Sequence, residues 1–106
     1  MTRNPQHHLA TAKYHFSIAV EHGQRELTDQ VTIDAISLRI MAGVDALNEL
    51  TPEAREALVG DAWRDMRAMR NRIAHAYDTV DSKRLEQTLR EDIPILIERL
   101  DALLAT

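Results

Sequence analysis

Residues 29–50, DQVTIDAISLRIMAGVDALNEL, carry apolar side chains at the spacing of an α-helix. Positions three or four residues apart fall on one side of a helix, and those here are large and apolar: Ile33, Ile36, Ile40, Val44 and Leu47. Leu38 and Met41 are expected to widen this apolar face. We therefore expect a helix that starts at Asp29 or Thr32 and lies at the centre of the fold.

The sequence on either side of this segment divides into further helices, separated by residues that end or begin helices. The spacing of apolar residues predicts helices with bounds of about 6–22, 52–59, 61–75 and 82–104. Gly23 and Gly60 are typical of the position just after a helix end. Side chains that cap the first turn of a helix are expected at Thr51, Asp61 and Asp81 or Ser82.

Pro94 lies inside the last of these helices, whose apolar stripe runs from Leu85 to Leu104. Proline has no N–H to bond the carbonyl of Arg90, so a kink is expected there. The fold class that these patterns predict is all-α, an up-and-down bundle of four to five helices. The length fits a single domain, residues 1–106.

The composition narrows the kinds of site that the chain can build. It has no cysteine, which excludes disulfides, thiolate metal sites and a cysteine nucleophile. His8, His15 and His22 recur every seven residues, but successive members lie about 10 Å apart along a helix and cannot share one ion. We therefore expect no metal and no cofactor.

Charge and hydropathy indicate where the protein is located and whether it binds membranes or nucleic acid. No stretch approaches the roughly 20 apolar residues of a membrane span, and residues Met1 to Leu9 lack the apolar run of a signal peptide. A cytoplasmic protein without membrane contact is expected. Because the net charge is −4, the chain as a whole does not attract nucleic acid, and a nucleic-acid site must be a local basic patch.

Such a patch occurs in residues 63–77, WRDMRAMRNRIAHAY, where four arginines fall within nine residues beside one acid. At about 100° per residue on a helix, one stripe of this segment is mostly apolar: Trp63, Met66, Met69, Ile73 and Tyr77. A second stripe is polar and basic: Arg64, Arg67, Asn71 and His75. This second stripe is either a binding surface or an ordinary solvated face.

Arg70 projects close to the apolar stripe, between Trp63 and Tyr77, and is expected to be half-buried. An arginine in that position either pairs with an acid, such as Asp45 on the preceding long helix, or lines a cleft. The first arrangement is structural and the second is typical of a catalytic or binding residue.

Arg70, His75 and Tyr77 form the pattern R-x4-H-x-Y, which resembles the motif of the HEPN superfamily and of its small HepT-like branch. The flanking residues also resemble that branch: Trp63-Arg64, Met69 to Arg72, Val80-Asp81 and Glu91-Asp92-Ile93-Pro94. The resemblance spans roughly residues 33–104. Residues 42–46, AGVDA, match the Gly-Glu-Ala-like step of the family more loosely.

The resemblance implies a metal-independent ribonuclease, commonly the toxin half of a toxin–antitoxin pair, with Arg70 and His75 as its catalytic residues. It implies a small nucleotidyltransferase as the antitoxin. In that branch the partner can nucleotidylate the motif tyrosine, here Tyr77, and so silence the toxin. Proteins of this kind are typically dimers with facing motifs, so the resemblance also implies a homodimer.

The residue types suit RNA cleavage. RNA carries its own nucleophile, the 2′-hydroxyl, so the protein need only move protons and stabilise charge on phosphorus. Histidine transfers protons near neutral pH, and arginine binds phosphate with two parallel N–H groups. Asn71 shares a face with His75 and could orient it or bind phosphate. Three further arginines are expected to bind RNA: Arg64, Arg67 and Arg72. No pair of carboxylates at metal spacing stands out, so no divalent metal is expected to be needed.

The spacing of Arg70 and His75 bears on the oligomeric state. Five residues apart on a continuous helix, their side chains diverge by about 140° and cannot both face one phosphate. Either the helix ends before His75, or a second copy of the chain supplies the missing group. A different kind of function stays open: a non-catalytic helical binding module that serves a nucleotidyltransferase partner.

Overall fold

The computed structural model describes residues 4–106, and all regular structure within them is helical. The expectation of an all-α fold is confirmed. Residues 1–3 lie outside the described residues. They include the expected start of the domain and the beginning of the Met1–Leu9 segment. The long and short helices are α1 (Pro5–His22), α2 (Gln30–Asn48), α3 (Pro52–Val59), α4 (Ala62–His75), α5 (Ser82–Gln87) and α6 (Ile93–Leu104).

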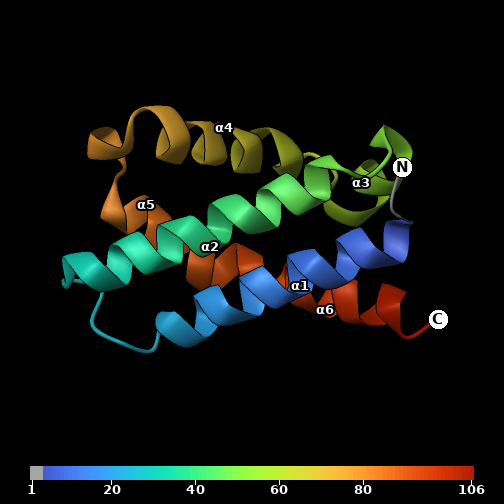
Figure 1. Ribbon diagram of the computed structural model, residues 1–106, viewed down its shortest axis with the longest axis horizontal. Helices are drawn as coiled ribbons and strands as arrows, with labels where there is room; N and C mark the ends of the chain where they lie inside the picture. Colours follow the sequence, from blue (N-terminus) through green and yellow to red (C-terminus); the bar gives the residue numbers. More distant parts are fainter. Residues whose placement is uncertain (1–3) are drawn as a thin grey trace.

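Helix α2 occupies the central position that its apolar repeat predicts. It runs between α4 and α1, and α6 packs against α1 on the other side (Figure 1). The largest fully buried side chains come from several helices: Phe16, Ile36, Ile40, Leu47, Leu58, Ile93 and Leu100. Leu38 does not widen the apolar face of α2, because its side chain is 58% exposed. It lies two residues from Ile36, about 200° round the helix, and therefore points away from the core.

Gly43 sets how closely α1 and α2 approach each other. A Cβ atom at this position would lie 2.5 Å from Cε1 of Phe16, whose ring is fully buried. Such a contact is too short for two carbon atoms, so a side chain at position 43 would push the helices apart. The glycine therefore allows the phenyl ring to pack directly on the backbone of α2.

Of the three expected caps, those at Thr51 and Asp81 are formed and the one at Asp61 is not, while Asp29 supplies a further cap. Asp29, Thr51 and Asp81 each accept a hydrogen bond from a backbone N–H in the first turn of the helix that follows. Asp61 precedes α4 but makes no capping bond. Its backbone already has helical dihedrals (φ −64°, ψ −20°), because Gly60 reverses the chain with a positive φ of 55°. A capping side chain needs an extended backbone instead.

The expected kink at Pro94 takes the form of a wider helical turn. Between α5 and α6, residues Thr88–Asp92 form a single stretch of π-helix. This turn ends immediately before Ile93 and Pro94, where the missing N–H interrupts the α-helical ladder. Within residues 4–106, no helix combines the length and apolarity needed to cross a membrane.

Candidate functional site

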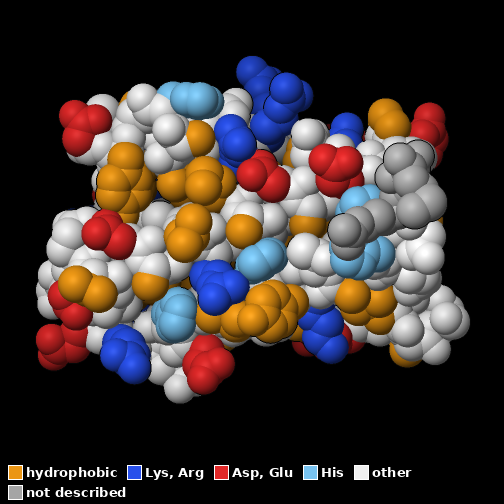
Figure 2. All heavy atoms as spheres, viewed as in Figure 1, with side chains coloured by type: hydrophobic (Ala, Val, Ile, Leu, Met, Phe, Trp, Pro, Cys, Tyr) orange, Lys and Arg blue, Asp and Glu red, His pale blue; other side chains and the backbone are white. Residues whose placement is uncertain are grey.

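Helix α4, which carries the arginine-rich segment, is attached to the bundle along one side only. Ile73 is its single buried residue, and Trp63, Met66 and Met69 pack partly against the core. The helix packs mainly on α2. Its outer side faces solvent, and Figure 2 shows Lys and Arg side chains gathered over this part of the molecule, next to acidic side chains below them.

Arg70 is held by Asp45 of α2. Its Nε donates to Asp45 Oδ1 at 2.7 Å, and its Nη2 donates to Asp45 Oδ2 at 3.4 Å. The Arg70 side chain is 28% exposed, as expected for a half-buried position. The hydrogen bond and the charge of Asp45 raise the pKa of Arg70, so the guanidinium stays charged.

The same arginine also lines a cleft, so both arrangements that the sequence left open occur together. The cleft lies between α2 and α4 and has a volume of about 260 Å³. Arg67, Arg70 and Asn71 reach it from α4, and Asp45 and Asn48 reach it from α2. Nη1 of Arg70 lies 3.4 Å from Oδ1 of Asn71 and donates to it. The polar lining of the cleft therefore consists of two arginine cations, two asparagine amides and one carboxylate.

His75 does not reach this cleft. It is the last residue of α4 and is exposed, and its imidazole makes no hydrogen bond or ion pair within the part of the chain that the structure describes. The helix continues through His75, so the chain does not turn His75 back towards Arg70. Of the two alternatives, a second copy of the chain that supplies the missing group is the one that remains. The two side chains diverge by about 140° on this continuous helix.

Tyr77 lies beyond the end of α4, in a short 3₁₀ turn, Tyr77–Thr79. Its hydroxyl donates a hydrogen bond to the carboxylate of Asp34 on α2, and its side chain is 37% exposed. Burial raises the pKa of Tyr77, and the bond to Asp34 raises it further. The same bond, together with one from Gln30, lowers the pKa of Asp34. At neutral pH the pair is a protonated phenol and an ionised carboxylate.

Sequence reasoning missed Asp34, although a signal was present. Asp34 and Asp45 are eleven residues apart, which is about three helical turns and places both on one face of α2. Each accepts a hydrogen bond from the segment of residues 70–77. Two acids at this spacing on a largely apolar helix could have indicated polar partners on the neighbouring helix.

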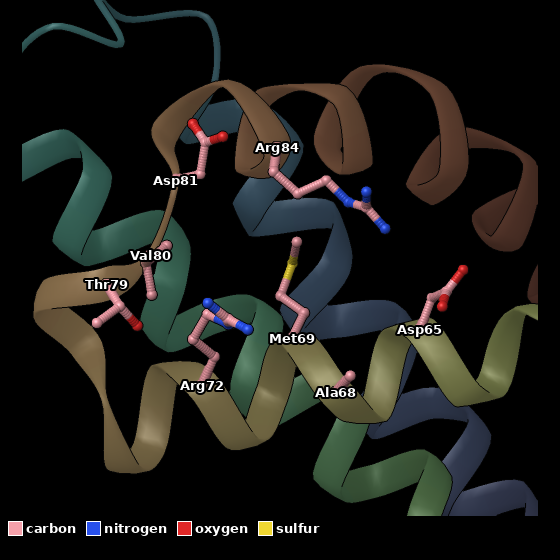
Figure 3. Close-up of a pocket in the computed structure, with 8 residues that line it drawn as sticks. All are labelled: Asp65, Ala68, Met69, Arg72, Thr79, Val80, Asp81 and Arg84. Carbon is pink, nitrogen blue, oxygen red and sulfur yellow. The ribbon is translucent and has the colours of Figure 1, made fainter.

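The three arginines expected to bind RNA do not lie together. Arg67 lines the cleft beside Arg70, and Arg64 is exposed on the outer side of α4. Arg72 lies in a different cleft, of about 290 Å³, between α4 and the start of α5. Figure 3 shows Arg72 there with Arg84 of α5, and with Thr79 and Val80 of the connecting segment. Among residues 4–106, no group of three or more His, Asp or Glu side chains is placed to hold a metal ion.

Comparison with known proteins places the chain in one family. No curated protein and no solved structure gave a match. The family model described as "Ribonuclease HepT-like" matches residues 12–103, which include Asp34, Asp45 and the whole R-x4-H-x-Y pattern. This match covers most of the chain and agrees with the helical bundle and with the motif at the end of α4. The chain therefore belongs to the HepT-like ribonuclease family.

Proposed function

We propose that this chain is a metal-independent endoribonuclease toxin in which Arg70 binds the reacting phosphate and His75 transfers protons. Membership of the family supports ribonuclease activity. The observation that carries the proposal is the way Asp45 holds Arg70. A guanidinium has five N–H donors, and Asp45 uses Nε and one donor of Nη2. Nη1 also donates to Asn71, so one donor remains on each Nη, and these two are available to the oxygens of a phosphate.

The cleavage step uses a nucleophile that RNA itself supplies. The 2′-oxygen forms a bond to the adjacent phosphorus, the bond from phosphorus to the 5′-oxygen breaks, and a 2′,3′-cyclic phosphate results. One proton leaves the 2′-hydroxyl and another reaches the departing 5′-oxygen, and His75 is the group suited to carry them. Arg70 stabilises the charge that builds up on the phosphate oxygens. Arg64 and Arg67 extend the positive surface along the RNA, and Arg72 does so from the neighbouring cleft.

The proposal includes a homodimer with a shared site, because α4 is continuous through His75. A two-fold axis beside α4 would bring Arg70 of one chain towards His75 of the other. The exposed, unpartnered position of His75 fits such a role. We treat residues 1–106 as a single domain in this assembly.

A second candidate function is a non-catalytic helical module that binds a nucleotidyltransferase partner. The ion pair between Arg70 and Asp45 favours it, because a purely structural arginine would make the same contact. The two candidates differ in one result, cleavage of RNA by the purified chain.

We expect the purified chain to cleave labelled RNA in EDTA and to leave cyclic or 3′-phosphate ends. The reason is that the proposed site uses a histidine and an arginine and needs no bound metal. DNA of the same sequence is the matched control and should stay intact, since it lacks the 2′-hydroxyl. Activity that is lost in EDTA and returns with Mg²⁺ would contradict the mechanism. Absence of cleavage in both buffers would favour the binding module.

We further propose that the partner is a small nucleotidyltransferase antitoxin that silences the chain by modifying Tyr77. Incubation with such an enzyme and ATP is expected to add one nucleotidyl group and to stop RNA cleavage, because a bulky anion near His75 would compete with the RNA phosphate. The chain has two tyrosines, so intact-mass spectrometry of Tyr14→Phe and Tyr77→Phe locates the adduct. Tyr14 is the more exposed of the two, at 58%, and is a strict control. An adduct that persists in Tyr77→Phe would refute the assignment.

A further inference from the structure

The segment that contains His75 is fixed to α2 at both ends. Before it, Arg70 bonds to Asp45, and after it, Tyr77 bonds to Asp34. The two acids lie about three turns apart on one face of α2. Between these attachments His75 makes no polar contact of its own among the described residues. Its position therefore depends on what holds the backbone on either side.

The backbone after His75 leaves the helix and next meets the hydrophobic core at Val80. Ala76 leaves the helical conformation with φ −147° and ψ 50°. The turn that follows is closed by local bonds, such as Thr79 Oγ1 to the carbonyl of Ala76 at 2.7 Å. The turn is tied to α2 through the Tyr77 hydroxyl, which donates to Asp34 and also interacts with Ser37 and Gln30 of the same helix.

The geometry points to Asp34 as a positioning residue: it anchors Tyr77, thereby fixes the turn after His75, and loses this hold when Tyr77 is nucleotidylated. The inference rests on the proposed function, since it concerns the regulation of the same site. It adds that silencing acts by releasing the segment that carries His75, besides covering the site. Gln30 supports the arrangement, because its Nε2 donates to Asp34 Oδ1 at 2.8 Å and holds the carboxylate in place.

Nucleotidylation removes the hydrogen bond by its chemistry. The phenolic oxygen of Tyr77 forms a bond to the α-phosphorus of a nucleoside triphosphate, the bond from that phosphorus to the leaving oxygen breaks, and pyrophosphate departs. The phenolic proton passes to solvent, so the oxygen can no longer donate to Asp34. The new phosphodiester is negative and would lie beside an ionised carboxylate, which repels it. Tyr77 must therefore leave Asp34, and the turn loses its attachment to α2.

Amide hydrogen exchange tests the anchor without any RNA. In Asp34→Ala and in Tyr77→Phe, the amides of Thr79 and Val80 are expected to exchange roughly tenfold faster, because one bond to a charged group is lost. The double variant should exchange no faster than Tyr77→Phe alone, since that variant already lacks the bond to Asp34. Asp34→Asn keeps an oxygen acceptor and should restore part of the protection. Glu49→Ala, at an exposed acid just after α2, is the matched control and should change nothing.

Cleavage kinetics then test the link to His75. Asp34→Ala is expected to lower kcat about tenfold and to leave KM nearly unchanged, because it displaces the proton-transfer group and not the RNA-binding arginines. Unchanged exchange in Asp34→Ala would overturn the anchor, and faster exchange with unchanged kcat would overturn its positioning role. If the wild-type chain does not cleave RNA, the proposed function fails, while the exchange result still decides whether Asp34 anchors the turn.

Discussion

Replacing either Arg70 or His75 with alanine is expected to lower RNA cleavage by roughly a thousandfold and to change thermal stability little. A positioned acid–base group contributes about 10²–10⁴ to a rate, and a positioned charge at the reacting centre contributes about 10²–10³. The ion pair of Arg70 with Asp45 is open to solvent, so its loss should cost less than about 1 kcal/mol of stability. His75 is exposed and has no bonded partner among the described residues, so its removal should leave the fold intact.

Single-turnover cleavage and differential scanning calorimetry on the same preparations measure the two effects. Two matched controls are present in the chain. His22 also ends a helix, α1, and Arg90 also forms an ion pair with an acid, Glu86, at 3.0 Å. Their alanine variants should keep wild-type activity. If Arg70→Ala loses activity only together with a large fall in Tm, Arg70 is a structural residue. If both site variants remain active, the catalytic assignment is wrong.

Mixing the inactive Arg70→Ala and His75→Ala chains is expected to restore about a quarter of the wild-type activity. Random exchange of subunits makes half of the dimers mixed, and a mixed dimer with shared sites keeps one of its two sites intact. The expectation follows from the continuous α4, which turns the two side chains away from each other within one chain. The measurement is the cleavage rate after the mixture has equilibrated, beside light scattering for the oligomeric state.

The control for this experiment is a chain that carries both substitutions. Mixed with either single variant, it cannot complete a site and should restore nothing. A monomer at micromolar concentration would refute the shared site. A stable dimer without recovery would keep the dimer but place each complete site within one chain.

The sequence predicted the helices well because their apolar spacing is a local property. The sequence did not predict local features whose conformation depends on neighbouring turns or on packing. Asp61 was expected to cap α4, but the turn at Gly60 already places it in a helical conformation. The break near Pro94 was expected, but its form as a π-helical turn was not, because the way a chain relieves a missing hydrogen bond depends on the packing around it.

The site was predicted in part for a similar reason. A helical projection indicates which side chains share a face, and it placed Arg70 at the edge of the apolar stripe correctly. It does not indicate which residue of α2 lies opposite each of them. The sequence indicates Asp45 as a possible partner of Arg70, but it does not indicate that Asp34 pairs with Tyr77. The separation of Arg72 from Arg67 also depends on the position of the α4–α5 connection, which the sequence pattern does not give.

The weak attachment of α4 has a consequence for how such a protein can change over generations. Of its 14 residues, only Ile73 is buried, so substitutions at most other positions leave the hydrophobic core as it is. The core is supplied largely by the other helices, above all α1, α2 and the C-terminal segment. Mutations on the exposed side of the arginine-rich helix therefore carry little penalty in folding. Under the proposed function, selection for a new RNA target would act on α4 and selection for a stable fold on the other helices, so the first can proceed without disturbing the second.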